Sequence, residues 1–153
     1  MCLGISLAIH ELPIPLVEKL QQRTIQRDVD AVREIRFLYV EKPAILPVWH
    51  DGQKKIYRWG NGGRKDLPGG GWCRQESLEA GHWQHLRPEL VEIPADYARQ
   101  GQIWFQVPSS IQGLLIRDSQ RQAHVYMLTK PASHYYHVMT RSPRMPQFMG
   151  EDI

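Results

Sequence analysis

Short runs of β-branched and aromatic residues, separated by glycines, prolines and other turn formers, constrain the fold of this chain most. The clearest pair, 45–50 and 53–59, flanks the dipeptide Asp51-Gly52. These two residues tolerate the positive φ angles of a two-residue turn, so the stretch predicts a β-hairpin. Further short strands are expected at 37–40, 90–93, 103–107, 111–116 and 124–129, with an apolar strand before Pro13.

Helical spacing appears once, where apolar residues between Leu16 and Ile35 recur three or four positions apart. This spacing predicts one helix over 16–36, or two short helices that break near Asp28. The glycine-rich segment 60–71 is expected to be a mobile surface loop, and the proline-containing segment 131–153 is expected to be irregular. Together these elements predict one α+β domain over residues 1–153, β-rich, with a mostly antiparallel sheet or small barrel and a few peripheral helices.

Composition limits the function less than it limits the fold. The chain has 153 residues, 19 basic and 16 acidic side chains and two cysteines. A net charge of +3 is too mild to indicate nucleic-acid binding, but basic residues cluster between 54 and 74 and between 117 and 144. No secretory pattern and no apolar run of membrane-spanning length is present, so we expect a soluble, cytoplasmic protein with free thiols.

Familiar cofactor and catalytic motifs are missing. The segment 60–65 lacks the spacing of a phosphate-binding loop, and no nucleophile elbow of the G-x-S-x-G type occurs. The histidine pairs His82/His85 and His134/His137 have no further ligands at sensible spacing. We therefore expect neither a metal nor another cofactor.

Cys2 has special chemistry if Met1 is removed, because it then carries a free α-amine beside its thiol. An α-amine is partly neutral near pH 7.5, and a thiolate is a strong nucleophile. Such a 1,2-aminothiol condenses with an aldehyde to an imine, which the sulfur closes into a thiazolidine. An abasic site in DNA offers such an aldehyde. The alternative is a cysteine that happens to come second.

Five short motifs, in order along the chain, resemble those of the SRAP family (SOS response-associated peptidase domains). The family's "MCGR", "PV…RWGL", "ARxET", "IPADGFYEW" and "TxPA…HDRMP" patterns are similar to Met1-Cys2-Leu3-Gly4, Pro47-Val48 with Arg58-Trp59-Gly60, Cys73-Arg74-Gln75-Glu76-Ser77, Ile93-Pro94-Ala95-Asp96, and Thr129-Lys130-Pro131-Ala132 with Arg144-Met145-Pro146. The resemblance runs nearly the full length of the chain.

The resemblance implies a mostly antiparallel β fold with a basic cleft that binds single-stranded DNA. It implies that Cys2 crosslinks abasic sites after the chain removes its own leader. Arg58, Arg74 and Arg144 are carried over as phosphate-binding or active-site arginines, and Trp59 as a residue that stacks on a base or wedges between bases. The alternative is structural: arginine–glutamate pairs and a half-buried tryptophan.

The chain departs from the family at three polar positions expected to act in catalysis and at a fourth near the N-terminus. The family's asparagine, glutamate and histidine fall on Trp72, Gln100 and Ser142, and the arginine of "MCGR" falls on Ile5. The interval from Thr129 is about two residues longer here, so His137 is an alternative for the family's histidine. General acid–base groups contribute about 10²–10⁴-fold in rate, so these changes leave open whether the chain is an enzyme. Three functions remain: a crosslinking protein with Cys2 as nucleophile, a non-enzymatic DNA-binding module, and a thiol hydrolase, which lacks a visible base.

Overall fold

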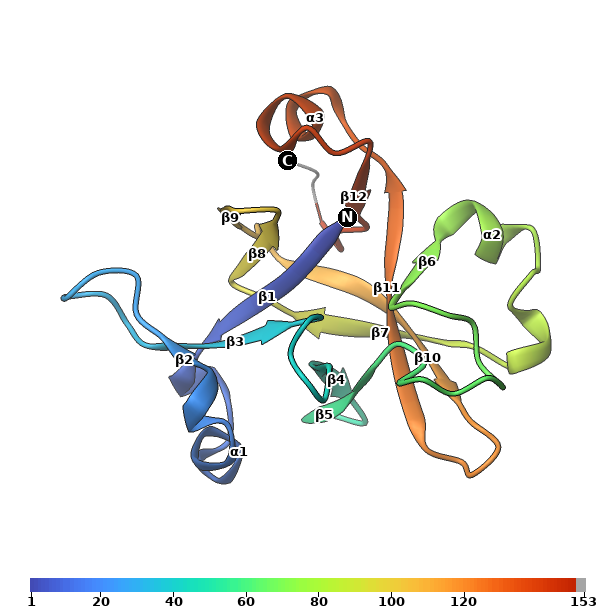
Figure 1. Ribbon diagram of the computed structural model, residues 1–153, viewed down its shortest axis with the longest axis horizontal. Coiled ribbons are helices and arrows are strands. Elements are labelled where there is room, and N and C mark those ends of the chain that lie inside the picture. The colour runs from blue at the N-terminus through green and yellow to red at the C-terminus, as the bar shows by residue number, and fades with distance from the viewer. Residues whose placement is uncertain (151–153) are drawn as a thin grey trace.

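The computed structural model describes residues 1–150 and is built mainly from strands (Figure 1). The strands are β1 Cys2–Ala8, β2 Thr24–Ile25, β3 Glu34–Leu38, β4 Ile45–His50, β5 Gln53–Trp59, β6 Trp72–Arg74, β7 Glu89–Pro94, β8 Tyr97–Gln100, β9 Ile103–Gln106, β10 Ser110–Arg117, β11 Ala123–Pro131 and β12 Arg144–Pro146. The α-helices are α1 Ile14–Lys19, α2 Gln75–Glu79 and α3 His134–Thr140, with 3-10 turns at Ile9–Glu11, Gln21–Arg23 and Gln84–Leu86.

One sheet closes on itself. Its strands pair in the order β10-β7-β4-β5-β11, and β10 also pairs with β11, which completes a five-stranded ring. The expected β4–β5 hairpin is present, and Asp51 and Gly52 have φ angles of 53° and 73°. These left-handed values match the twist of the two strands. The predicted β-rich α+β class, mostly antiparallel, is confirmed; β11 pairs in parallel with β5 and β6.

A second sheet packs against this barrel, in the order β2-β3-β1-β8-β9. β1 lies between β3 and β8 and is antiparallel to both. One hydrophobic core joins the two sheets, because Ile5 and Phe37 of the second sheet pack in the same cluster as Leu46 and Ile93 of the barrel. All four side chains are fully buried. The N-terminal strand is therefore a central element of the fold, which fixes the position of Cys2.

The prediction of helix over 16–36 is wrong beyond the first turns. α1 ends at Lys19, and 34–38 forms β3, so the strand expected at 37–40 begins earlier and ends at Leu38. Ile35 and Phe37 are buried because β3 pairs with β1 along five positions. Val29 and Val32, which suggested a helical face, are 87% and 57% exposed. The long-range pairing of β3 with β1 therefore outweighs the local helical spacing of the apolar residues.

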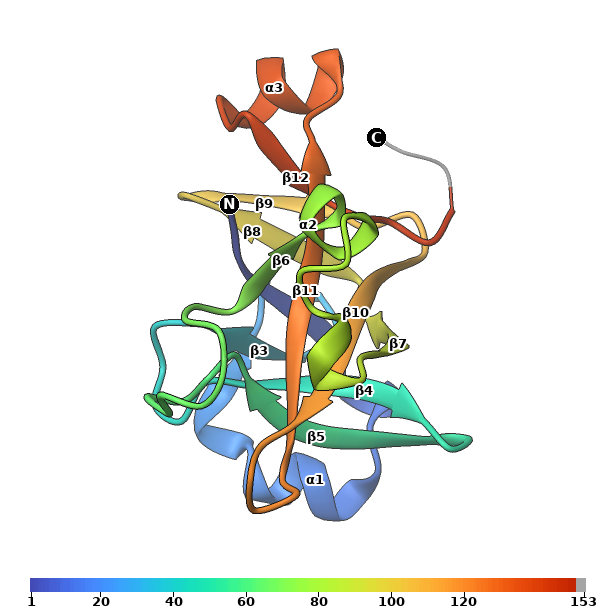
Figure 2. The ribbon, with the colours of Figure 1, turned by 90° about the vertical axis from the view of Figure 1, so that its right-hand side faces the viewer.

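The prediction of irregular structure over 131–153 is also wrong, although 151–153 lie outside the described residues. α3 begins after Ser133, whose hydroxyl accepts a hydrogen bond from the backbone N–H of Tyr136, as an N-cap does. β12 then pairs with β11. Both elements lie at the end of the molecule where the N-terminus is found (Figures 1 and 2). No helix within residues 1–150 has the length and apolar character required to cross a membrane.

Candidate functional site at the N-terminus

Strands β6 and β12 both pair with the end of β11 and so bring two arginines together. Arg74 pairs with Thr129, and Arg144 pairs with Pro131, two positions further along. A cavity of about 460 Å³ lies between these segments and the N-terminus. Its lining includes Met1, Trp72, Arg74, Thr129, Ser142 and Arg144. We call it the N-terminal cavity.

Neither Cys2 nor Gln100 lines this cavity, but Cys2 directly follows Met1, which does. Cys2 and Gln100 are paired residues on β1 and β8, at a bulge between Cys2 and Gly4. The indole N–H of Trp72 donates to the Cys2 carbonyl oxygen at 3.0 Å, which links β1 to the cavity wall. The structure thus brings Cys2 to the same end of the molecule as Arg74. Trp72, Gln100 and Ser142, at which the chain departs from the SRAP motifs, lie at this end too.

The Cys2 thiol is protected in a chain that retains Met1. The residue is 1% exposed, and its Sγ–H donates to the Gly4 carbonyl at 3.3 Å. Burial raises the pKa of this thiol to about 11, so it carries little thiolate at neutral pH. Met1 is 51% exposed and lines the cavity, and its peptide bond occupies the Cys2 amine. Removal of Met1 would free this amine and take one residue out of the cavity lining.

Tyr136 is a neighbour of this site that the sequence did not single out. It comes from α3, is fully buried, and its hydroxyl donates to Oε1 of Gln100 at 3.2 Å. Burial, with a smaller contribution from the nearby Cys2 thiol, raises the pKa of Tyr136, so the phenol stays neutral. The only signal in the sequence was an aromatic residue in a segment expected to be irregular.

The side chains at Trp72, Gln100 and Ser142 each form a hydrogen bond within the fold. Trp72 donates to Cys2, as described, and the Gln100 amide accepts from Tyr136. The Ser142 hydroxyl donates to the Arg144 carbonyl oxygen at 2.7 Å. Indole, amide and hydroxyl groups do not titrate near neutral pH, so none of them replaces a general acid or base at this site.

The two arginines of the cavity differ in their bonding. Arg144 forms a two-pronged ion pair with Glu76 at 2.6 and 3.1 Å and also donates to the Thr129 carbonyl and hydroxyl. The hydrogen bonds that Glu76 accepts from Arg144 lower the pKa of Glu76 to about 2. Arg74 is exposed and has no side-chain hydrogen bond or ion pair within residues 1–150. Arg74 is therefore available to bind an anion. Arg144 instead forms the arginine–glutamate pair that was the structural alternative to DNA binding.

The expectation that Trp59 stacks on DNA bases is wrong for this structure. Trp59 is 1% exposed, and its indole N–H donates to the Gly71 carbonyl at 2.8 Å. Its ring packs edge-on against Tyr39 and Trp72, with centroids 5.2 and 5.7 Å away. A buried ring has no free face for a base. The half-buried Tyr39 and Trp72 each line a cavity and are the aromatic surfaces that this cluster exposes.

Arg58 lies in a different cavity. This cavity, of about 310 Å³, is lined by Tyr39, Lys42, Pro43, Arg58 and the glycines at 62 and 63, among others. Arg58 is exposed and forms no side-chain hydrogen bond or ion pair within residues 1–150. Arg58 therefore lies in a different cavity from Arg74 and Arg144, so the three expected arginines do not line one cavity.

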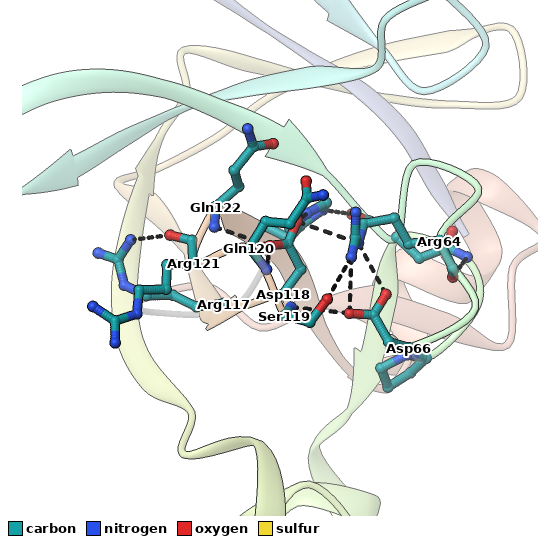
Figure 3. Close-up of polar contacts among 12 residues, drawn as sticks. Arg64, Asp66, Arg117, Asp118, Ser119, Gln120, Arg121 and Gln122 are labelled. Carbon is teal, nitrogen blue, oxygen red and sulfur yellow. Dashed lines mark hydrogen bonds and ion pairs between the residues drawn. The ribbon is translucent and has the colours of Figure 1, made fainter.

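A polar network fixes the base of the 60–71 loop (Figure 3). Buried His124 contacts the Gly60 carbonyl at 2.7 Å and the Asp118 carboxylate at 2.9 Å. Burial raises the pKa of Asp118, but its hydrogen bonds and the charge of Arg64 outweigh this effect, and the net pKa is lowered. Arg64 also binds Asp66 within the loop. The loop has no regular structure but is anchored to the β10–β11 turn.

Comparisons with known proteins give no match. No protein-family model fits the chain, and no curated protein or solved structure is similar to it. Within residues 1–150, no group of three or more histidine, cysteine or acidic side chains is placed to hold a metal ion.

Proposed function

We propose that this chain binds single-stranded DNA at the N-terminal cavity and, once Met1 is removed, captures the aldehyde of an abasic site with Cys2. One observation carries the proposal: segments far apart in sequence place an unpaired arginine, an aromatic ring and the N-terminus around one cavity next to Cys2. A cationic groove with aromatic platforms is the usual means of binding single strands. Arg74 supplies the charge and Trp72 the ring.

The covalent step uses both nucleophiles of Cys2. The free amine adds to the aldehyde carbon and loses one water to form an imine. The sulfur then forms a bond to the same carbon, and the thiol proton passes to the nitrogen, which completes a thiazolidine. Removal of Met1 is required because it releases the amine. The thiol, which is 1% exposed in the chain that retains Met1, must also become accessible to the aldehyde.

A non-covalent DNA-binding module is the second candidate, and two observations favour it. The Cys2 thiol has its pKa raised to about 11, and the side chains at 72, 100 and 142 offer no titrating group. The same cavity would bind the strand without reacting. The two candidates share DNA binding and differ only in the adduct.

Fluorescence anisotropy with labelled oligonucleotides tests the shared step. We expect tighter binding to a single strand than to the matching duplex, and a steep loss of affinity with salt, because phosphate contacts release counterions. Arg74→Ala should lower the slope of log K against log salt by about 0.7, the value of one single-strand phosphate contact. Arg117→Ala removes an equal charge in a separate surface cavity and serves as the control. Equal affinity for duplex, or identical slopes for both variants, would overturn the proposal.

A further inference from the structure

Two cavities meet at the segment that joins β3 to β4. The 310 Å³ cavity that contains Arg58 and a larger one of about 700 Å³ are both lined by Glu41, Lys42 and Pro43. The larger cavity continues to α1 and the turn after it, at Lys19 and Arg23. We call the two together the β3–β4 groove. Both volumes fall within the range of ligand pockets, about 300–1,000 Å³.

The groove is positively charged. Lys19, Lys42 and Arg58 line it and form no side-chain hydrogen bond or ion pair within residues 1–150. Arg23 donates from Nη2 to the Pro43 carbonyl, while its Nη1 is buried and has no partner among the described residues. The one acid of the lining, Glu41, already has both carboxylate oxygens bound by Arg36, at 3.2 and 3.3 Å. The unbalanced charge favours an anion.

The walls between these cations are apolar. Leu16, Leu20, Ile45 and Ile56 line the larger cavity and are half-buried. In the smaller cavity the wall is Tyr39, whose ring is supported from behind by Trp72 at a centroid distance of 4.6 Å. Alternation of cations with apolar and aromatic surface suits a chain of phosphates that carries flat, apolar-faced bases.

The groove is connected to the N-terminal cavity through the 60–71 loop. Asn61 lines the smaller cavity of the groove and Gly70 lines the N-terminal cavity, and the Asn61 N–H donates to the Gly70 carbonyl at 3.2 Å. The aromatic cluster of Tyr39, Trp59 and Trp72 separates the two. The N-terminus, this loop and the β3–β4 segment lie along one side of the molecule, with α1 below them (Figure 2).

From this geometry we infer that a single DNA strand bound at the N-terminal cavity continues across the 60–71 loop into the β3–β4 groove. Its phosphates contact Lys42 and Lys19, and its bases lie against Tyr39 and the apolar walls. The inference rests on the proposed function and extends it, because it gives the strand a direction and a second contact region. The bases of a duplex are paired with each other and cannot contact the walls of the two cavities. The groove therefore favours single strands over duplex.

Affinity measured against oligonucleotide length tests the inference. A strand of about four nucleotides fills the N-terminal cavity alone, whereas one of about twelve reaches the groove. The double variant Lys19→Ala/Lys42→Ala should weaken binding of the long strand about 25-fold at 0.1 M salt. Each lost phosphate contact lowers the slope of log K against log salt by about 0.7, and two contacts together give this factor. The double variant should leave binding of the short strand unchanged. Tyr39→Ala should likewise weaken binding of the long strand, and Tyr39→Phe, which keeps the ring, should not.

The controls separate this inference from the proposed function. Arg117→Ala, which removes one positive charge outside the groove, should bind both strands as the unaltered protein does. If the unaltered protein binds both strands but the double variant binds the long one equally well, the groove is not used and only the inference fails. An equal loss in Arg117→Ala would also overturn it, because charge alone would then explain the effect. If the unaltered protein binds neither strand, the proposed function fails first.

Discussion

Replacement of Trp59 by phenylalanine distinguishes a structural tryptophan from one that stacks on DNA. The change removes the hydrogen bond from the indole to the Gly71 carbonyl, worth about 1 kcal/mol. That carbonyl also accepts from the Met127 N–H, so it is not left without a partner. Loss of about two buried carbon groups adds roughly 1.6 kcal/mol. The free energy of unfolding should therefore fall by about 2.5 kcal/mol.

Urea unfolding followed by circular dichroism measures this change. With an m-value of about 2 kcal/mol/M, the midpoint should fall by about 1.2 M. The same substitution at Trp49, which lies on β4 and is 46% exposed, should shift it by less than about 0.3 M. At urea concentrations where both are folded, Trp59→Phe should bind single-stranded DNA as before. An unchanged midpoint together with weakened DNA binding would refute the assignment of Trp59 to the core.

Three further predictions follow from contacts near the two binding regions. The protonated Glu11 carboxyl donates a hydrogen bond to Asp96, which together with burial raises the pKa of Glu11 from 4.5 to about 7, so the folded protein holds a proton that the unfolded chain has lost. Stability should therefore fall as pH rises from about 4.5 to 7, and Glu11→Gln should remove that slope in urea midpoints. Glu76→Ala should release Arg144 from its ion pair and strengthen binding of single-stranded DNA in anisotropy, whereas weaker binding would contradict the assigned pairing. Gly71→Ala would place a Cβ 2.6 Å from the indole nitrogen of the buried aromatic cluster, and should lower the melting temperature by roughly 4–8 °C for a cost of about 2 kcal/mol.

The sequence predicted those parts of the fold that depend on local chemistry. The β4–β5 hairpin followed from Asp51-Gly52, and most barrel strands followed from their apolar runs. The helix expected over 16–36 failed because the burial of Ile35 depends on a pairing with β1, about thirty residues away, which no local pattern reveals. Strands β6 and β12 are only three residues long, too short to show a periodicity. Both exist because β11 is long enough to pair with them.

Motif order predicted part of the candidate site but not the bonding within it. Motif order placed Arg74 and Arg144 with Cys2, and the structure brings all three to one end of the barrel. Whether each arginine is paired depends on three-dimensional neighbours, so the sequence could not distinguish Arg144, bound by Glu76, from the unpaired Arg74. The tryptophan expected to be exposed is buried because the glycine at 71 lets its ring approach the backbone closely.

The most direct test of the account is crosslinking of an abasic oligonucleotide by protein whose N-terminus is shown by intact mass to be Cys2. We predict an adduct that survives a denaturing gel, maps to Cys2 and has the mass of both partners less one water. Cys73→Ala should still give it, because burial raises the pKa of that thiol to about 12 and leaves it unreactive, whereas Cys2→Ala should give none. Protein that retains Met1 should bind the oligonucleotide without reacting. If protein that begins at Cys2 binds the oligonucleotide for hours and forms no adduct, covalent capture is wrong and the chain is a non-covalent DNA-binding module.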